Sequence, residues 1–467
     1  MRIYNTLTRT VEEFKPNTEG KVKIYTCGPT VYHFAHIGNL RSYIHEDILE
    51  KYLRYAGYEV DRAMNITDVG HLSSDGDTGD DKMVSSAKRE HKSVLDIAKF
   101  YTDAFFADFQ KLNIRKPDTV IPATTQIEEY IKIITKLLAD GYAYESGGNI
   151  YFDTSKLKDY YVLTNHKKED LLVGVREDVE EDENKRNKED FVLWFTKSKF
   201  EDQELKWESP WGYGYPGWHI ECSCISMKYL GEHLDIHCGG VDNIFPHHTN
   251  EIAQSEAYLG HKWCNYWFHI EHLNLGSAKM SKSKGEILTV DSLIEKGYRP
   301  LSYRYFVLSS HYRRTLEFTL ENLSGAENAY LKLKSRISRL NKENDILEEA
   351  TFDKYKKQFM DALEDDFNTS LALTTVYDVL KADTNDYTKR KLIEDFDQVL
   401  SLDLLKEEEM AAPIVENEAE ILSLIAERNE AKKNKDYARA DEIRNSLAEQ
   451  GIRLIDTKEG TKFEVLR

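Results

Sequence analysis

The sequence contains little cysteine and no long apolar run. Only five of its 467 residues are cysteines, and this odd number argues against the paired disulfides of a small secreted protein. No stretch approaches the roughly 20 apolar residues of a membrane span, and the first residues lack the apolar segment of a secretory signal. We therefore expect a cytoplasmic protein without a membrane span. The cysteine thiols of such a protein are either buried or metal ligands. The five cysteines are Cys27, Cys222, Cys224, Cys238 and Cys264.

Positive charge is also scarce. The chain has 63 lysines and arginines against 82 aspartates and glutamates, so its net charge is −19. This argues against a protein that coats nucleic acid without specificity. It does not exclude an RNA held by local basic stretches such as 332–339 or 432–435. For any one of these stretches taken alone, a solvated helix face is the favoured interpretation. The length predicts three or more structural units rather than a single core.

The hydrophobic pattern predicts a nucleotide-binding α/β unit near the N-terminus. Val22–Cys27 has the composition of a strand, residues 40–57 have apolar residues at helical spacing, and Tyr58–Asn65 predicts a second strand. Strand, glycine-containing turn, helix and strand in this order form one half of such a unit. The second half is expected to resume near Leu234–Cys238, with a helix at His247–Leu259.

The sequence outside this α/β unit predicts an insertion, a helical region and a small C-terminal region. A charged stretch at 177–190 belongs to an insertion between the two halves. From about Leu316 the pattern is helical, with few glycines or prolines until the Ala-Pro pair at 412–413, which marks a linker. Residues 421–447 predict helices, and a small strand pair is expected around Asp456–Thr461.

Two motifs point to a nucleotide. KMSKS at 279–283, followed by Gly285, gives a cationic loop that can fold over a polyphosphate, and HIGN stands far upstream at 36–39. Taken alone, the first is compatible with a basic surface loop and the second with a histidine near a turn. Because both occur in this order, the sequence resembles the class I aminoacyl-tRNA synthetases, whose signature motifs are HIGH-like and KMSKS-like. The residues between them narrow the resemblance to the cysteinyl-tRNA synthetases.

The resemblance covers nearly the whole chain and implies an α/β fold. The implied parts are a Rossmann-type parallel-sheet catalytic domain with an inserted connective domain, then an α-helical bundle that carries Phe367-Asn368-Thr369, and a small mixed α/β C-terminal domain. The implied boundaries are 1–116 and 208–270 for the two halves of the catalytic domain, 117–207 for the insertion, 271–325 for the KMSKS loop and stem-contact region, 326–410 for the bundle, and 411–467 for the anticodon-binding domain.

The resemblance also implies a site for ATP. His36, Gly38, Asn39 and Lys282 would bind ATP, and His36, Asn39, Lys279 and Lys282 would be the catalytic residues, with Lys282 preferred over Lys279 as the ATP contact. A helix N-terminus offers N–H groups and a positive dipole end to phosphate, and glycine lets the nucleotide approach the backbone. Asn39 stands in place of the second histidine of the motif. The loop lysines would stabilise charge on the α-phosphate and the leaving pyrophosphate.

Two thiols, an imidazole and a carboxylate lie in the separate segments TCGPTVY, PGWHIECS and PHHTNEIAQSE. From the residues alone this signal is weak, because the spacing matches no local zinc finger and buried thiols with a capping histidine pair explain it equally well. The resemblance implies that Cys27, Cys222, His247 and Glu251 bind one zinc ion, with His248 as the competing candidate. Zinc would separate cysteine from serine, because it prefers a soft thiolate, whereas an apolar pocket supplies only about 1–3 kcal/mol.

Further contacts follow from the same resemblance. The implied substrate-binding residues are Gly28, Thr67, Trp218, His219, His237 and Asp242. The implied tRNA-binding residues are Lys432, Asp441 and Asp456. The implied partners are ATP with Mg²⁺, L-cysteine and the cysteine-specific tRNA (tRNA-Cys), and a monomer is expected. Two other interpretations stay open: a cysteine ligase for a small amine, such as the amino-sugar ligase of mycothiol synthesis, and a synthetase-like RNA-binding protein without activity.

The sequence departs from the family pattern at four places. Gly70–Gly79 is inserted after the NITD segment, close to the expected active site. Tyr215 stands where arginine is expected. Lys432 also replaces an arginine, and this second replacement removes a planar bidentate contact. Phe463 replaces a tryptophan near the end of the chain.

Overall fold

The fold is built around a five-stranded parallel sheet, as the N-terminal strand–helix–strand pattern predicts. In this computed structural model the strands lie in the order β11-β10-β3-β4-β5, and every neighbouring pair is parallel. Their bounds are β3 Lys21–Thr26, β4 Glu59–Ile66, β5 Thr119–Pro122, β10 Leu234–Gly240 and β11 Cys264–Ile270. The three predicted strands of the α/β unit are therefore confirmed to within one or two residues.

The structure describes most of the chain, with several gaps. The described residues are 1–69, 93–164, 182–197, 205–275, 278–279, 288–407, 418–434, 436–449, 452–457 and 460–465. Several predictions fall outside them, namely Gly70–Gly79, Lys282 and the linker at 412–413.

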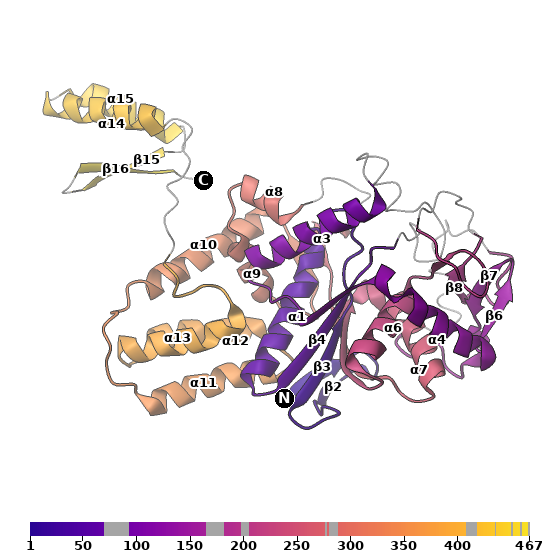
Figure 1. Ribbon diagram of the computed structural model, residues 1–467. Helices are drawn as coiled ribbons and strands as arrows, with labels where there is room; N and C mark the ends of the chain where they lie inside the picture. The colour runs from indigo at the N-terminus through magenta and orange to yellow at the C-terminus, as the bar shows by residue number, and fades with distance from the viewer. Residues whose placement is uncertain are drawn as a thin grey trace. The chain divides into compact units, whose positions relative to one another are not determined.

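Strand β3 shows why both faces of the sheet are covered. Ile24 belongs to the apolar cluster that includes α1 (Ile37–Tyr55), whereas Tyr25 belongs to the cluster that includes α6 (His219–Leu230). Both side chains are fully buried, and they separate because successive side chains of a strand point to opposite faces. Figure 1 shows α1 and α6 on either side of the strands. The sheet is therefore sandwiched by helices, as in the predicted fold class.

Helix α1 carries three carboxylates that are buried against the rest of the unit. Arg62 of β4 is fully buried and pairs with Glu46 and Glu50, each at 3.1 Å. Arg304 of α9 (Pro300–Leu308) pairs with Asp47 at 2.6 Å. One arginine thus ties α1 to the sheet and the other ties it to α9, which fixes the helix whose N-terminus carries the HIGN motif.

Replacing Arg62 by methionine is expected to lower the free energy of unfolding by about 3–5 kcal/mol, because the buried carboxylate of Glu46 would lose its guanidinium partner. Burial already raises the pKa of Glu46 to about 7. Arg2→Met is the control: it removes one partner of the exposed Arg2–Asp365 pair and should change stability by at most about 1 kcal/mol. Urea unfolding followed by tryptophan fluorescence measures both variants. Equal unfolding free energies would contradict the role given to Arg62.

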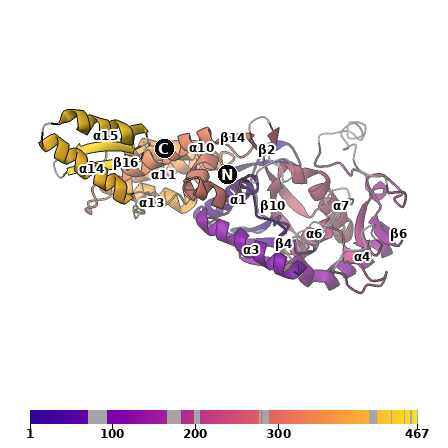
Figure 2. The ribbon, with the colours of Figure 1, turned by 90° about the horizontal axis from the view of Figure 1, so that it is seen from above.

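Residues between β5 and β10 form a second, antiparallel sheet in the order β6-β7-β8-β9, whose last strand lies beyond the predicted end of the insertion at 207. Tyr215, which stands where arginine is expected, is buried on β9 and stacks on Phe195 of β8 with ring centroids 4.9 Å apart. It is therefore an interior residue of this sheet. The two views place the sheet and the helical bundle on opposite sides of the central sheet (Figures 1 and 2). The bounds are β6 Ala143–Ser146, β7 Asn149–Phe152, β8 Phe191–Phe195, β9 Tyr215–Pro216 and, beside them, α4 Ile127–Ala139.

The helical pattern predicted from about Leu316 is confirmed. A short strand β14 (Leu316–Phe318) precedes four helices, which are α10 Leu320–Ile337, α11 Glu349–Glu364, α12 Thr369–Lys381 and α13 Asp386–Leu400. Their apolar faces join the same buried cluster as α1. The other elements of this unit are β1 Arg2–Asn5, β2 Thr10–Glu13, α3 Val94–Lys111, α7 Thr249–Leu259, β12 Leu273–Leu275, β13 Ala278–Lys279 and α8 Val290–Glu295.

Residues from Lys406 onward form a separate compact unit, and the larger unit spans Met1–Leu405. The smaller unit contains two helices and an antiparallel strand pair, as the sequence predicts, and its core includes Ile425 and Leu447. Phe463 pairs in register with Leu454 in the ladder. The finer division of the larger unit stays a prediction. The elements of the smaller unit are α14 Glu418–Lys433, α15 Tyr437–Glu449, β15 Ile452–Thr457 and β16 Gly460–Val465.

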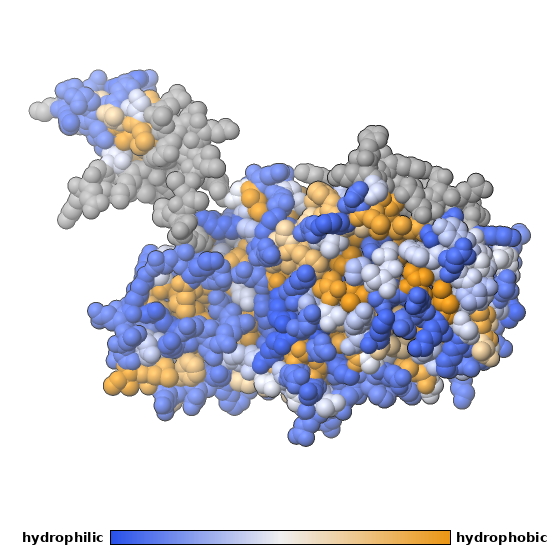
Figure 3. Space-filling model, in the orientation of Figure 1, coloured by the Kyte–Doolittle hydropathy of each residue, from blue (hydrophilic) through white to orange (hydrophobic). Residues whose placement is uncertain are grey.

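The surface is in keeping with the charged composition. On the face shown in Figure 3, hydrophilic residues cover much of the larger unit, with hydrophobic patches between them. Among the described helices, none combines the length and the hydropathy that a bilayer crossing requires.

Candidate active site and metal centre

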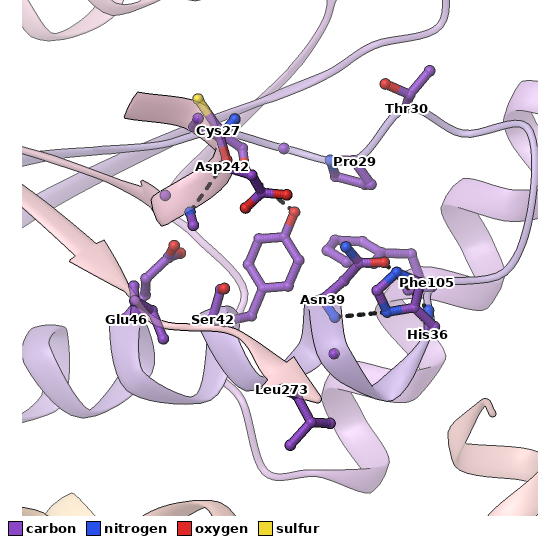
Figure 4. A pocket seen from close by; sticks show the side chains of 18 of the residues that line it. Cys27, Pro29, Thr30, His36, Asn39, Ser42, Glu46, Phe105, Asp242 and Leu273 are labelled. Atoms are coloured by element: carbon purple, nitrogen blue, oxygen red, sulfur yellow. Dashed lines mark hydrogen bonds between the residues drawn. The ribbon is translucent and has the colours of Figure 1, made fainter. Parts of the chain in front are cut away.

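A pocket of about 370 Å³ opens where the strand order reverses. The chain passes from β3 to β4 and β5 on one side, and later to β10 and β11 on the other, so β3 and β10 meet at the switch point. Ligands of open parallel sheets bind beyond the carboxyl ends of the strands at such a point. The walls come from residues that follow β3, residues at the end of β10 and the start of α1. Figure 4 shows Cys27, Asp242 and His36 around this space.

The HIGN motif forms the N-terminus of α1. The backbone N–H of Asn39 donates to Nδ1 of His36 at 3.0 Å, and the backbone N–H of His36 donates to the side-chain oxygen of Asn39 at 3.4 Å (Figure 4). The asparagine that replaces the second histidine therefore closes a capping box. Because Nδ1 accepts a hydrogen bond, the neutral imidazole carries its proton on Nε2. His36, Gly38 and Asn39 all line the pocket.

Gly28 marks a close approach between β3 and β4. A Cβ at this position would lie 1.6 Å from the carbonyl oxygen of Asn65, so only glycine fits. The Asn65 side-chain oxygen accepts from the Gly28 N–H at 2.7 Å, and its amide donates to Oγ1 of Thr67 at 2.9 Å. Thr67 in turn donates to Glu221 at 2.7 Å. The sequence interpretation named Gly28 and Thr67 but missed Asn65 and Glu221, although Asn65 stands in the same NITD segment.

The four predicted metal ligands converge from three parts of the chain. Sγ of Cys27 lies 3.9 Å from Sγ of Cys222 and 3.9 Å from Oε1 of Glu251. Nε2 of His247 lies 3.6 Å from Sγ of Cys222 and 3.1 Å from Oε1 of Glu251. Donors held about 2.0–2.3 Å from a tetrahedral zinc ion are about 3.3–3.8 Å apart. The spacing of the four donor atoms therefore fits one such ion, and the structure groups them as a candidate metal site.

The charges of the cluster also suit a cation. Burial raises the pKa of the Cys27 and Cys222 thiols and raises the pKa of Glu251 to about 8. Burial thus disfavours the anionic forms, which are the forms that bind metals. A divalent cation held between these groups would offset that cost by direct attraction.

A second set of donors overlaps the first. It consists of Cys27, His237, His248 and Glu251. Nε2 of His248 lies 3.2 Å from Sγ of Cys27, and Nε2 of His237 lies 2.8 Å from Oε2 of Glu251. His248 also faces Nε2 of His269 at 2.7 Å, a contact that the sequence did not predict. His248 therefore stays a competitor, and the first set is favoured because it offers two thiols.

The remaining substrate candidates surround these donors. Trp218 and Asp242 line the pocket, and the Trp218 ring lies 4.4 Å from that of His247. Nδ1 of His219 lies 2.9 Å from Nδ1 of His247, on the side of the ring opposite its Nε2. Trp218 and His219 thus hold the imidazole of His247, and His237 holds the carboxylate of Glu251.

The other predicted residues lie on separate elements. Lys279 is on β13, which pairs with β12, and Lys282 lies outside the described residues. Lys432 and Asp441 are on α14 and α15 of the smaller unit, where Asp441 pairs with Arg444 at 3.3 Å. Asp456 is on β15. The roles of these residues stay predictions.

The fold and the pocket define a class I aminoacyl-tRNA synthetase. Residues 13–328 match the model of the class I (C) tRNA synthetase catalytic domain, and residues 358–402 match the DALR domain. The solved structure of Mycobacterium tuberculosis methionyl-tRNA synthetase in complex with methionyl-adenylate superposes with a TM-score of 0.56, at 15% identity, covering 82% of this chain and 91% of that chain. At that identity the likeness concerns the fold.

Curated relatives narrow the class further. A cysteine–tRNA ligase from Treponema denticola is 46% identical over 492 residues and covers 100% of both chains. One from Borrelia turicatae is 43% identical over 479 residues and covers 99% of each. The chain therefore belongs to the cysteine–tRNA ligase family.

Proposed function

We propose that this chain is an ATP-dependent cysteine–tRNA ligase. A carboxylate oxygen of L-cysteine attacks the α-phosphorus of Mg-ATP, the bond to pyrophosphate breaks, and cysteinyl-adenylate forms. A ribose hydroxyl of the 3′-terminal adenosine of tRNA-Cys then attacks the carbonyl carbon, and AMP leaves. The observation that carries the proposal is that the capped start of α1 and Cys27 of the four-donor cluster line one pocket, in a chain that matches cysteine–tRNA ligases over its full length.

The start of α1 supplies the phosphate end of the site. The positive end of the helix dipole favours phosphate oxygens, and Nε2 of His36 adds a donor. The N–H groups of Ile37 and Asn39 already donate to the Leu288 carbonyl and to Nδ1 of His36. Lys279 and Lys282 supply positive charge to the α-phosphate and the leaving pyrophosphate. No covalent enzyme intermediate is needed, because positioning and electrostatics carry the rate.

The donor cluster supplies the cysteine end. Cys27, Cys222, His247 and Glu251 hold one zinc ion in this proposal. Zinc bound there favours cysteine over serine, because it prefers a soft thiolate to a hydroxyl and lowers the pKa of a thiol. The contact of His237 with Glu251 at 2.8 Å orients the carboxylate.

A tRNA rather than a small amine is the acceptor in this proposal. The chain carries a DALR domain and a smaller C-terminal unit, which a ligase for a small amine does not need. Lys432, Asp441 and Asp456 of that unit would contact bases of a single-stranded loop. The proposal includes a monomer as the working unit and the cytoplasm as its location.

Exchange of labelled pyrophosphate into ATP tests the first step. We expect exchange that depends on L-cysteine and that serine does not support, because both amino acids fit the pocket in size but only cysteine offers a thiolate. Exchange with neither amino acid, or equal exchange with both, would contradict the proposal.

A further inference from the structure

A second pocket, of about 290 Å³, lies in the larger unit where the loop after α9 meets the start of α12. Its lining consists only of polar side chains, which are Ser309, Ser310, His311, Arg314, Asn368 and Ser370. None of these six residues carries a carboxylate. Hydroxyl, amide and guanidinium donors without an acid suit an anion better than a cation or an apolar ligand.

One buried side chain connects this pocket with the active site. The guanidinium of Arg41, on α1, donates to the backbone carbonyls of His272, His311 and Arg314, and Arg41 is fully buried. His272 lines the active-site pocket, whereas His311 and Arg314 line the second one. Residues that line the two pockets therefore bond to a single guanidinium, so the two pockets are neighbours.

Hydrogen bonds connect the two segments that line the pocket, the loop after α9 and the start of α12. Asp366, just before α12, accepts from the Tyr312 hydroxyl and from Nε of Arg313, each at 2.6 Å. Asp366 and Phe367 have φ values of 58° and 54°. This left-handed conformation costs roughly 1–3 kcal/mol per residue and persists only where the surroundings impose it. The pocket is thus held in shape before any ligand arrives.

The positive charge of the pocket comes from Arg314. The guanidinium of Arg313 is paired with Asp366 at 2.6 Å, and Nε2 of His311 lies 3.7 Å from the same carboxylate. Arg314 is exposed, and no carboxylate among the described residues pairs with it. Arginine with several hydroxyls is the combination that recognises phosphate oxygens.

We propose that this second pocket binds one backbone phosphate of the bound tRNA, with Arg314 as its charged contact and Ser310 and Ser370 as hydroxyl donors, whereas the Ser309 hydroxyl already donates to the Phe306 carbonyl. The inference rests on the proposed function. The tRNA is favoured over a free anion because its 3′ end occupies the active-site pocket. Its backbone then carries further phosphates past the neighbouring second pocket.

Binding of a fluorescent tRNA-Cys transcript to the full chain, measured by anisotropy at several salt concentrations, tests the inference. For Arg314→Gln we expect roughly three- to tenfold weaker binding. The slope of log K against log [salt] should become shallower by about 0.7–0.9, which is the loss of one phosphate contact. Lys132→Gln removes the same charge from an exposed position on α4 and should behave like the wild type.

A second variant distinguishes the loss of a phosphate contact from a folding defect. Ser370→Asp places a carboxylate in the first turn of α12, where it interacts favourably with the helix dipole, but it should repel a phosphate. We expect it to weaken tRNA binding at least as much as Arg314→Gln, with a thermal unfolding midpoint close to that of the wild type.

The results of these binding experiments distinguish failure of the phosphate contact from failure of the proposed function. Wild-type affinity and salt slope in both variants would overturn the phosphate contact and leave the proposed function standing. Inorganic phosphate that binds the wild type but not Arg314→Gln, with tRNA binding unchanged, would identify a small-anion site and equally overturn the inference. A wild-type chain that neither binds nor charges tRNA would overturn the proposed function and the inference with it.

Discussion

Replacing Cys222 by serine is expected to release the metal and to abolish the preference for cysteine over serine. Cys222 contributes one of the two thiols in the favoured donor set, 3.6 Å from Nε2 of His247 and 3.9 Å from Sγ of Cys27. A serine hydroxyl does not ionise at neutral pH and is a poor ligand for a soft cation. Metal content measured by atomic absorption should fall from about one ion per chain to near zero. The remaining preference for cysteine over serine would be that of an apolar pocket without a metal, about 1–3 kcal/mol.

The neighbouring Cys224 provides a matched control. It lies on the same helix, is as buried as Cys222, and packs in the apolar cluster of the insertion rather than beside the donors. Cys224→Ser should cost some stability, because a hydroxyl enters an apolar environment, but it should keep the metal and the selectivity. Retained preference for cysteine in metal-free Cys222→Ser would contradict the account.

A third variant separates the two overlapping donor sets. His248→Gln removes the ring that lies 3.2 Å from Cys27 and leaves the first set complete, so the metal should remain. If His248→Gln loses the ion while Cys222→Ser keeps it, the second set holds the metal and the assignment of Cys222 and His247 is wrong.

Replacing Lys282 by alanine is expected to slow cysteine activation by about 10²–10³-fold, the usual cost of removing one donor that stabilises charge in the transition state. Binding of cysteine should hardly change, because the residues proposed to hold it lie just after β3 and β4, around α6, in and after β10, and around the start of α7. Pyrophosphate exchange measures the activation rate, and calorimetric titration with cysteine measures the binding.

Lys284 serves as the control for Lys282. It stands just outside the KMSKS motif, so Lys284→Ala removes a charge from the same segment without touching the signature. A few-fold effect at most is expected for this control. An unchanged exchange rate in Lys282→Ala would exclude Lys282 from the transition state.

The local pattern of the sequence predicted those parts of the fold that depend on neighbouring residues. The strand that ends at Thr26, the helix that starts at Ile37 and the return strand over Glu59–Ile66 follow from periodicity and from Gly28. The predicted helix at His247 was slightly misplaced, because α7 begins at Thr249 and the preceding residues 244–248 are kinked at Phe245, whose backbone is extended (φ −140°, ψ 131°). His247 and Glu251 still meet, as their four-residue spacing requires.

The contacts between distant segments were not predictable in the same way. Asn65 holds Gly28 and Thr67, and Arg62 neutralises carboxylates of α1, only because parallel strands and a covering helix bring these residues together. Arg41 bonds to backbone carbonyls of residues that line two different pockets, and backbone contacts cannot be recognised from the sequence. The donor set itself came from resemblance, because its spacing along the chain matches no local motif.

Charging of unfractionated tRNA with labelled cysteine, with labelled serine in parallel, tests the central claim most directly. The account predicts strong ATP-dependent attachment of cysteine to tRNA and negligible attachment of serine, with the cysteine-specific acceptor saturating at its small share of the total tRNA. Cysteine-dependent pyrophosphate exchange without any attachment to tRNA would contradict it and point to a small-amine acceptor. Attachment of serine as efficient as that of cysteine would contradict selection by a thiolate-binding metal.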